Sequence, residues 1–347
     1  METLHIVVAG AGGNTGSHLL PHLARMSEVT RLTLVDPDTY MAENLHAQNV
    51  DSLNLGQPKV VAQAGRVRQI NPSLEVTAIR GLIEDIPRGL LQCDLIVSSV
   101  DNRAARQRIN ELAFRLNTPW VDCGILGSQN LARVNAYMPA QDAPCLECLW
   151  GEEDYAQIEQ EYLCGAEGSA YPTMASSALG ALAASLTALE VAKILSGDLA
   201  DSVVSKQILV DAQHHVMRVS DSRRNPACRF DHCSWVIEPW NYRVSTTTIG
   251  ATLNTIGSIS IEGHRFVQEL VCPSCGLQMK TLRLNRPFSR CPKCDRRMVS
   301  PGFGSLDRLD SELAEEYRSL TLAQIGLAIG DVISGSGNRH YRISEAV

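Results

Sequence analysis

The sequence predicts an α/β protein whose main domain is a doubly wound, mostly parallel sheet, followed by a small cysteine-rich C-terminal domain. Two observations predict the main domain. Apolar strand-like runs alternate with helical runs from residue 4 to about 121, and a glycine-rich turn joins the first strand to the first helix. A third observation, two Cys-x-x-Cys pairs between residues 272 and 294, predicts a zinc-ribbon unit. We place the domains at 1–240 and 241–347.

The expected elements follow in chain order, with right-handed crossovers between parallel strands. The strands are short and rich in Leu, Ile and Val: residues 4–9, 32–35, 74–79 and 94–98, a strand beginning at 120–121, and one at 207–211. The helices carry apolar residues at helical spacing: 17–26, 59–70, 102–116 and 174–195. The last helix is rich in Ala and Leu, so we expect it to be mostly buried.

Charge and composition limit the possible classes of function. The net charge is −7, which argues against a general nucleic-acid partner. No uninterrupted apolar run reaches about 18 residues, and the N-terminus METLHIVVAG lacks signal-peptide features, so we expect a cytoplasmic protein without a membrane span. Disulfides are rare in that compartment, so the 11 cysteines are expected to bind metal, react or fill the core.

The glycine-rich turn contains Gly10, Gly12, Gly13 and Gly16, spaced G-x-G-x-x-x-G between a strand and a helix. Backbone N–H groups of such a turn can approach phosphate at a helix N-terminus. Asp36 ends the second strand, where an acidic side chain can bind a ribose hydroxyl. The pattern predicts a bound nucleotide. A tight packing turn and an NAD-dependent dehydrogenase are the alternatives.

Polar residues after the second strand decide between these alternatives. Amide and ammonium groups suit a phosphate chain, and an Asp after a strand suits Mg²⁺; the residues are Asn44, Gln48, Lys59, Asp101, Asn102 and Arg106. Each alone has an ordinary explanation. Lys59 can be a solvated charge, and Asp101 can be the N-cap of the helix that follows. The ordered set is far more specific.

In this order the segments GAGGNTG, DPD, NLHAQ, GQPK and SVDNRAAR resemble the E1-like superfamily, which contains the ThiF, MoeB and HesA proteins and the ubiquitin-activating enzymes. The resemblance covers about residues 1–240. It implies a Rossmann-like adenylation fold, a homodimer, and adenylation with ATP and Mg²⁺. The implied substrate is the C-terminal carboxylate of a ubiquitin-like or sulfur-carrier protein that ends in glycine.

The resemblance also implies roles for individual residues. Gly10, Gly12 and Gly13 are the nucleotide-binding glycines, and Asp36 binds the ribose. Asn44, Gln48 and Lys59 hold the triphosphate. Asp101 coordinates Mg²⁺, supported by Asn102 and Arg106.

Two departures from the family pattern remove positive charge. Ala47 stands where the family often has Arg, and no Arg-bearing arm precedes the first strand. We expect Arg25, Arg103 or a second chain to supply this charge. The alternative is a degenerate, non-catalytic protein that only docks a modifier.

Eight cysteines are expected to bind about two zinc ions per chain. Cys145 and Cys148 form one corner of a tetrahedral site, and the resemblance supports Cys228 and Cys233 as their partners, with His232 a possible substitute. Cys272, Cys275, Cys291 and Cys294 match a zinc ribbon, which we expect to stabilise a domain with little core of its own. The basic residues around this ribbon suit protein docking at least as well as nucleic acid. Cys93 and Cys123 adjoin strands and are expected to pack in the core.

Cys164 is the remaining thiol. It lies in an expected crossover loop at about residues 150–173, the region where E1-like enzymes often carry a catalytic cysteine. The resemblance implies a thioester on Cys164 and transfer to an E2-like partner, as in bacterial ubiquitin-like conjugation operons. The alternatives are sulfuration of a carrier protein, as in ThiF and MoeB, and a loop thiol without a role.

Overall fold

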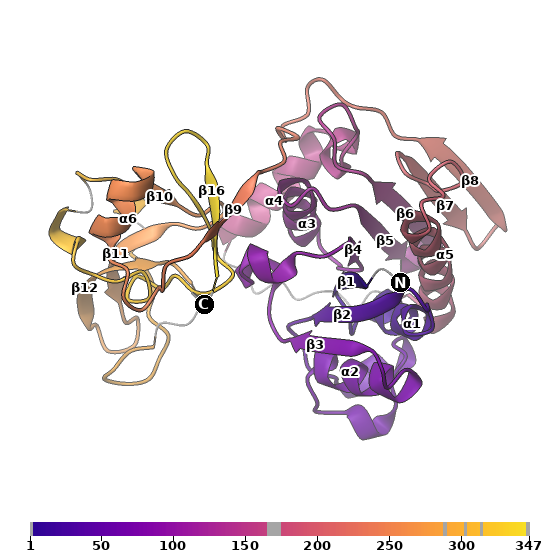
Figure 1. Cartoon of the computed structure of the whole chain (residues 1–347). Helices are drawn as coiled ribbons and strands as arrows, with labels where there is room; N and C mark the ends of the chain where they lie inside the picture. Colours follow the sequence, from indigo (N-terminus) through magenta and orange to yellow (C-terminus); the bar gives the residue numbers. More distant parts are fainter. Residues whose placement is uncertain (1–2, 165–174, 287–289, 302–303, 313–314, 345–347) are drawn as a thin grey trace. The chain divides into compact units, whose positions relative to one another are not determined.

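The computed structural model describes residues 3–164, 175–286, 290–301, 304–312 and 315–344, without the side chains of residues 159–164. They form two compact units (Figure 1). The first unit runs to Glu84 and resumes over Gln92–Ser234, and the second contains Asp85–Leu91 and the chain from Trp235 onward. The division lies close to the boundary expected at 240. The short segment Asp85–Leu91 was not expected in the second unit.

The first unit is built on one eight-stranded sheet in the order β3-β2-β1-β4-β5-β6-β7-β8. The first five strands in this order pair in parallel, and β6, β7 and β8 are antiparallel. The bounds are β1 Leu4–Ala9, β2 Val29–Val35, β3 Glu75–Ile79, β4 Leu95–Ser98, β5 Trp120–Leu126, β6 Leu131–Tyr137, β7 Lys206–Asp211 and β8 Val216–Asp221. The strand order reverses between β1 and β4, where the carboxyl ends of parallel strands form a binding crevice. The predicted doubly wound class is confirmed.

The described residues of this unit form five α-helices: α1 Asn14–Leu23, α2 Lys59–Ile70, α3 Arg103–Arg115, α4 Glu152–Cys164 and α5 Ser177–Leu195. Short 3-10 turns connect them: η1 Ala42–His46, η2 Ser52–Asn54, η3 Ile83–Asp85, η4 Arg88–Leu91, η5 Gly127–Gln129 and η6 Leu146–Leu149, of which η4 lies in the second unit. Alternate residues of the strands pack against α1, α2 and α5 in one apolar core.

Helix α4 corrects the expected crossover loop at 150–173. Its first turn carries Glu152, Glu153 and Asp154, and carboxylates there are favoured by the helix dipole. The Asp154 carboxylate also accepts a hydrogen bond from the Gly151 N–H at 2.8 Å. The acidic residues 152–154, which we expected in a polar loop, therefore form the first turn of a helix. Residues 165–173 lie outside the described part of the chain.

Helix α5 is long and apolar enough, by length and composition, to cross a membrane, and half of its apolar stretch is buried within the unit. The buried Glu190 accepts a hydrogen bond from the Val203 N–H at 2.8 Å and pairs with Lys193 at 2.7 Å. A core helix of a soluble protein passes the same test, and Glu190 has its partners inside the unit.

Where the structure describes it, the second unit forms two small sheets. One has five strands in the order β14-β10-β15-β16-β9, and the other has three in the order β12-β11-β13. The bounds are β9 Ile237–Trp240, α6 Ile249–Ile256, β10 Ile259–Ser260, β11 Phe266–Val271, β12 Gln278–Leu284, β13 Ser305–Leu306, β14 Arg308–Leu309, η7 Glu315–Tyr317, β15 Val332–Ser334 and β16 His340–Ile343. Segment Asp85–Leu91 joins this unit through a Gly89 N–H to Gly330 carbonyl bond of 2.8 Å and an Arg88–Glu262 ion pair.

The second unit has a substantial core of its own, which corrects the expectation of a unit with little core. Ile249, Leu253 and Ile256 bury one face of α6 in a single apolar cluster with Phe266 and Ile333. Burial of this apolar surface contributes stability that does not depend on a metal. A zinc ion in this unit therefore adds to an existing core instead of replacing one.

Two turns carry the C-terminal cysteine cluster: Cys272 and Cys275 lie between β11 and β12, and Cys291 and Cys294 lie after β12. Cys272 and Cys294 Sγ lie 3.4 Å apart, and Cys275 and Cys291 Sγ 3.6 Å apart. A tetrahedral zinc with Zn–S bonds of about 2.3 Å places its sulfurs about 3.8 Å from one another, so the four thiols fit zinc. Each pair sits in a tight turn closed by backbone bonds to the Cys272 and Cys291 carbonyls, with Gly276 and Asp295 at positive φ. This arrangement is that of a zinc ribbon.

We expect the Cys294→Ser variant to lose about one of two zinc ions per chain, because three thiolates hold zinc more weakly than four. Its second unit should also unfold at a lower temperature. Elemental analysis and calorimetry measure both effects. The matched Ser274→Ala variant, altered at an exposed position of the same cluster's first turn, should retain the metal. An unchanged zinc content in Cys294→Ser contradicts the site.

Candidate active site and metal centre

The glycine turn after β1 is held against the end of β4. Gly10 has a φ of +75°, and a Cβ there would lie 2.7 Å from the Ser99 carbonyl oxygen. A Cβ at Gly16 would overlap the Gly10 carbonyl oxygen. Gly10 and Gly16 are therefore required for close packing of the loop. Gly13 is the N-cap of α1 and offers no side-chain cap. The N–H groups of the first turn of α1 are thus available to an anion.

Asp36 directly follows β2, is buried and fixes this loop. One carboxylate oxygen accepts a hydrogen bond from the Gly12 N–H at 2.9 Å, and the other accepts one from the Asp38 N–H at 3.0 Å. Burial raises the pKa of Asp36, while nearby Lys59 and these N–H groups oppose that shift. The structure gives Asp36 a loop-organising role. Its contact with a ribose stays a prediction.

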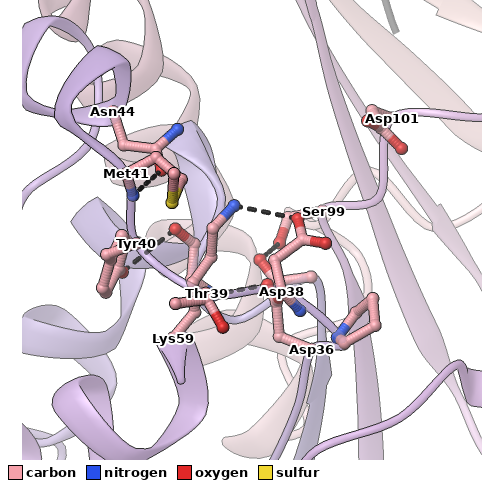
Figure 2. Close-up of polar contacts among 12 residues, drawn as sticks. Asp36, Asp38, Thr39, Tyr40, Met41, Asn44, Lys59, Ser99 and Asp101 are labelled. Carbon is pink, nitrogen blue, oxygen red and sulfur yellow. Dashed lines mark hydrogen bonds and ion pairs between the residues drawn. The ribbon is translucent and has the colours of Figure 1, made fainter. Parts of the chain in front are cut away.

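Lys59, the first residue of α2, lies against the glycine loop (Figure 2). Its Nζ pairs with the Asp38 carboxylate at 3.0 Å, and only 8% of its side chain is exposed. A Cβ at Gly12 would overlap the Lys59 side chain, so glycine there permits the approach. A solvated surface charge is thereby excluded for Lys59. A buried ammonium with one exposed carboxylate partner suits an incoming phosphate.

Asn44 and Gln48 lie on the segment after β2. The Asn44 side-chain oxygen accepts a hydrogen bond from the Met41 N–H at 2.8 Å, and Asn44 belongs to turn η1 (Figure 2). The Gln48 side-chain oxygen is buried without a hydrogen-bond partner among the described residues. An unpaired buried oxygen costs free energy unless a ligand or water donates to it. Their expected contact with a triphosphate stays a prediction.

Asp101 follows β4 and is exposed. The N-cap of α3 is Asn102, whose side-chain oxygen accepts a hydrogen bond from the Ala105 N–H at 2.7 Å. Asp101 is therefore not the cap that its position suggested, which leaves its carboxylate available to a cation. Arg106, expected to support Asp101, pairs with the buried Asp122 at 3.0 Å and donates to the carbonyl of Val100, the residue before Asp101, at 2.6 Å. Its part in nucleotide binding stays a prediction.

Neither in-chain arginine expected to replace the charge missing at Ala47 lies free beside the loop. Arg25 follows the C-terminus of α1, about 15 Å from the helix N-terminus at about 1.5 Å per residue. Arg103 pairs with Asp154 of α4 at 2.9 Å. A different arginine, Arg66 of α2, donates to the Asn49 carbonyl at 2.6 Å, close to the position of Ala47 in the chain.

Two residues that support the site, Tyr40 and Gln63, were missed by sequence reasoning. The buried Tyr40 hydroxyl donates to the Gly12 carbonyl at 3.1 Å and accepts from the Gln63 amide at 2.7 Å. A usable signal was present, because Lys59, Gln63 and Arg66 are spaced i, i+4 and i+7 and therefore share one face of α2. That face points toward the glycine loop and the Asn49 segment.

A second cysteine cluster lies in this unit. Cys145, Cys148, Cys228 and His232 each place one ligand atom within 4.8 Å of the others. Cys145 Sγ lies 3.8 Å from both Cys148 and Cys228 Sγ, and Cys148 Sγ lies 3.6 Å from His232 Nε2. The Cys145 thiol donates to Cys148, which lowers the pKa of Cys148 to about 4. Three sulfurs and one imidazole at these separations fit zinc.

His232 takes the place predicted for Cys233. Cys233 is exposed, and its N–H donates to the Asp231 carboxylate at 2.9 Å. Arg115 holds the same carboxylate with two bonds of 2.6 and 3.0 Å. His232 has a φ of +57° and packs edge-on to the Phe114 ring. This left-handed conformation brings the imidazole to the cluster. The second pair of ligands is therefore Cys228 and His232, spaced C-x3-H, instead of the predicted C-x4-C pair of Cys228 and Cys233.

Three cysteines belong to neither predicted zinc site: Cys93, Cys123 and Cys164. Cys123 is buried and its thiol donates to the Ser98 carbonyl at 3.2 Å, while Cys93 donates to the Leu95 carbonyl at 3.3 Å. Burial raises the pKa of each to about 12, which agrees with core packing. Cys164 is the last residue of α4, and its side chain lies outside the described residues.

We expect the His232→Ala variant to keep about one zinc ion per chain, whereas Cys233→Ser keeps about two, because only His232 faces the cluster. The His232→Cys variant, which restores a ligand, should recover the metal and so separate ligand loss from loss of packing on Phe114. Elemental analysis measures the content. Zinc loss in Cys233→Ser but not in His232→Ala would overturn this ligand set.

Comparison with known proteins adds to this geometry. The chain is 28% identical over 234 residues to the molybdopterin-synthase adenylyltransferase of Escherichia coli, covering 66% of this chain and 87% of that protein. It is 28% identical over 195 residues to the sulfur carrier protein ThiS adenylyltransferase of the same organism, covering 55% of this chain and 72% of the relative.

Among solved structures, the fold matches E. coli MccB crystallised with ATP, with a TM-score of 0.53 and 22% identity, over 65% of each chain. This chain therefore spans just under two thirds of MccB. The family model described as the ThiF family matches residues 1–230, which contain the glycine loop, Lys59, Asp101 and the first cysteine cluster except His232. This chain belongs to the ThiF family, within the E1-like superfamily.

Proposed function

We propose that this chain is an E1-like adenylyltransferase that uses ATP to activate the C-terminal carboxylate of a ubiquitin-like or sulfur-carrier protein. The observation that carries the proposal is the placement of three segments at the carboxyl ends of the strands, at the switch point of the sheet. These are the uncapped N-terminus of α1, Lys59 at the start of α2, and Asp101 after β4. Figure 2 shows Lys59 and Asp101. The relatives are named as adenylyltransferases, two of them for molybdopterin synthase and for ThiS.

The chemistry joins two anions. A carboxylate oxygen attacks the α-phosphorus of ATP, the bond from that phosphorus to the pyrophosphate oxygen breaks, and an acyl-adenylate and pyrophosphate result. Repulsion between the reactants must be reduced by fixed positive charge. Lys59 and the first turn of α1 supply such charge at the loop, and Arg66 adds a positive charge at the Asn49 segment.

The exposed carboxylate of Asp101 suits a divalent cation, and Mg²⁺ bound there would neutralise phosphate charge. Asp36 and Tyr40 position the glycine loop, because Asp36 accepts a hydrogen bond from the Gly12 N–H and Tyr40 donates one to the Gly12 carbonyl. A nicotinamide-dependent dehydrogenase does not account for Lys59, Asp101 and the family match together.

We expect Asp101→Ala and Lys59→Met to lower carrier-dependent ATP–pyrophosphate exchange by about 100-fold or more, because each removes charge compensation from the reacting phosphates. Methionine preserves the apolar stem that packs on Gly12. The control Asp142→Ala alters an exposed carboxylate elsewhere in the unit and should leave exchange unchanged. Wild-type exchange in Asp101→Ala removes the catalytic assignment. Absence of exchange in the wild-type chain would favour a degenerate docking protein.

After adenylation, we propose that Cys164 receives the carrier as a thioester and passes it to an E2-like partner. The Cys164 thiolate attacks the acyl carbon, and AMP leaves. Its place at the end of α4, anchored through Asp154 to Arg103 of α3, supports this role. Transfer of sulfur to the carrier is the second candidate, favoured by the names of the relatives. A homodimer and a cytoplasmic location are also proposed.

We expect incubation with ATP and the carrier to give a covalent adduct on a non-reducing gel that thiol reagents release, and Cys164→Ala to abolish it. The control Cys233→Ala removes an exposed thiol outside the metal cluster and should retain the adduct. A thiol-sensitive adduct that persists in Cys164→Ala assigns the thioester to another cysteine.

A further inference from the structure

A pocket of about 270 Å³ lies in the first unit beside the proposed active site. Its floor is one face of the sheet where β5, β6 and β7 run side by side. The register pairs Gly124 with Arg133, Leu126 with Leu131, and Arg133 with Leu209, so these five residues are neighbours on that face. The opposite face, with Cys123, Val134 and Ile208, is buried in the main core.

Gly124 leaves the floor open above two guanidinium groups. A Cβ at Gly124 would lie 3.1 Å from Arg106 Nη2 and 3.6 Å from Arg133 Nη2. Both arginines pair with the same buried carboxylate, Asp122, at 3.0 and 2.7 Å. Arg103, also in the lining, has Asp154 as its own partner. Two cations thus share one carboxylate, which leaves one positive charge at the floor.

Apolar groups surround this charge. Leu126, Leu131 and Leu209 lie on the sheet, and Leu146 and Trp150 line the pocket from turn η6 and the residue after it. Leu126 is 48% exposed, so the pocket opens to solvent at that side. A single charge among apolar walls suits a ligand that combines one carboxylate with an aliphatic group.

The pocket continues from the proposed active site. Arg106 Nη2 donates to the carbonyl of Val100, the residue before Asp101, and Arg106 lines the pocket as well. Ser98, three residues before Asp101, pairs with Asp122 in the sheet, and Gly124 lies two residues beyond Asp122. The pocket therefore adjoins the proposed active site, so the residues before the terminal carboxylate of a bound carrier can reach it.

We propose that this pocket selects carrier tails that bear an acidic side chain next to an aliphatic one, just before the terminal glycines. The inference rests on the proposed function and specifies its substrate. The acidic side chain pairs with Arg133, whose side chain is 32% exposed and has only Asp122 as a partner among the described residues. The aliphatic side chain contacts Leu126 and Leu131.

The test uses the full chain and three fluorescein-labelled peptides that differ at one position and end in Leu-Glu-Gly-Gly, Leu-Gln-Gly-Gly or Leu-Lys-Gly-Gly. Fluorescence anisotropy without ATP should show the Glu peptide binding about five-fold or more tighter than the Gln peptide, the scale of one charge-assisted hydrogen bond. Arg133→Gln should abolish that preference. The control Arg31→Gln, at an exposed arginine of β2, should keep it.

A second variant guards against a folding defect in the first. Leu126→Glu alters a half-exposed position and should reverse the preference toward the Lys peptide. Equal binding of the three peptides, no saturable binding up to about 1 mM, or a preference that survives Arg133→Gln overturns the inference. Acid-selective binding without peptide-dependent pyrophosphate exchange rejects the proposed adenylation and leaves the pocket assignment standing. Peptide-dependent pyrophosphate exchange without a preference for the acidic peptide rejects the pocket assignment and leaves the proposed adenylation standing.

Discussion

The Asp36 carboxylate is the contact on which the nucleotide side of the first unit depends. It is buried, and its two oxygens accept N–H groups from Gly12 and Asp38. The first bond fixes the glycine loop, and the second fixes the turn whose Asp38 side chain holds Lys59. Because hydrogen bonds to a buried carboxylate are strong, the loop and the lysine are set before a ligand arrives. Preorganised charge of this kind is what a reaction between two anions requires.

The first cysteine cluster lies next to the arginine pocket of the first unit. Cys145 and Cys148 flank Leu146, which lines the arginine pocket, and Trp150 follows two residues later. Helix α4 begins at Glu152 and is tied to α3 by the Arg103–Asp154 pair. A metal in the cluster would therefore stabilise the pocket wall and the start of the helix that ends at Cys164. Its contribution would be structural, and it would act on residues that line the proposed carrier pocket.

The sequence predicted the sheet and the glycine turn, and it correctly placed Lys59 at the start of a helix and Asp101 after a strand, because strand–helix alternation and loop spacing follow from local chemistry. Lys59–Ile70 was predicted to the residue. Prediction failed where backbone turns or distant partners decide. His232 replaces Cys233 because a left-handed residue turns the imidazole inward. Arg106 of α3 pairs with Asp122 of β5, a partner 16 residues away that motif reasoning could not identify. Helix α4 was read as a loop because its acidic residues look solvated, although they suit a helix start.

The placement of Asp85–Leu91 in the second unit has a consequence for the order in which the protein forms during synthesis. This segment leaves the ribosome well before Trp235 and the strands that follow it. The first unit can form its sheet from the residues before and after this segment. Gly89, within the segment, can form its hydrogen bond only after Gly330 has been synthesised. The second unit is therefore the last to fold. In a nascent chain halted before β15, the segment Asp85–Leu91 would lack the contacts that the completed second unit gives it.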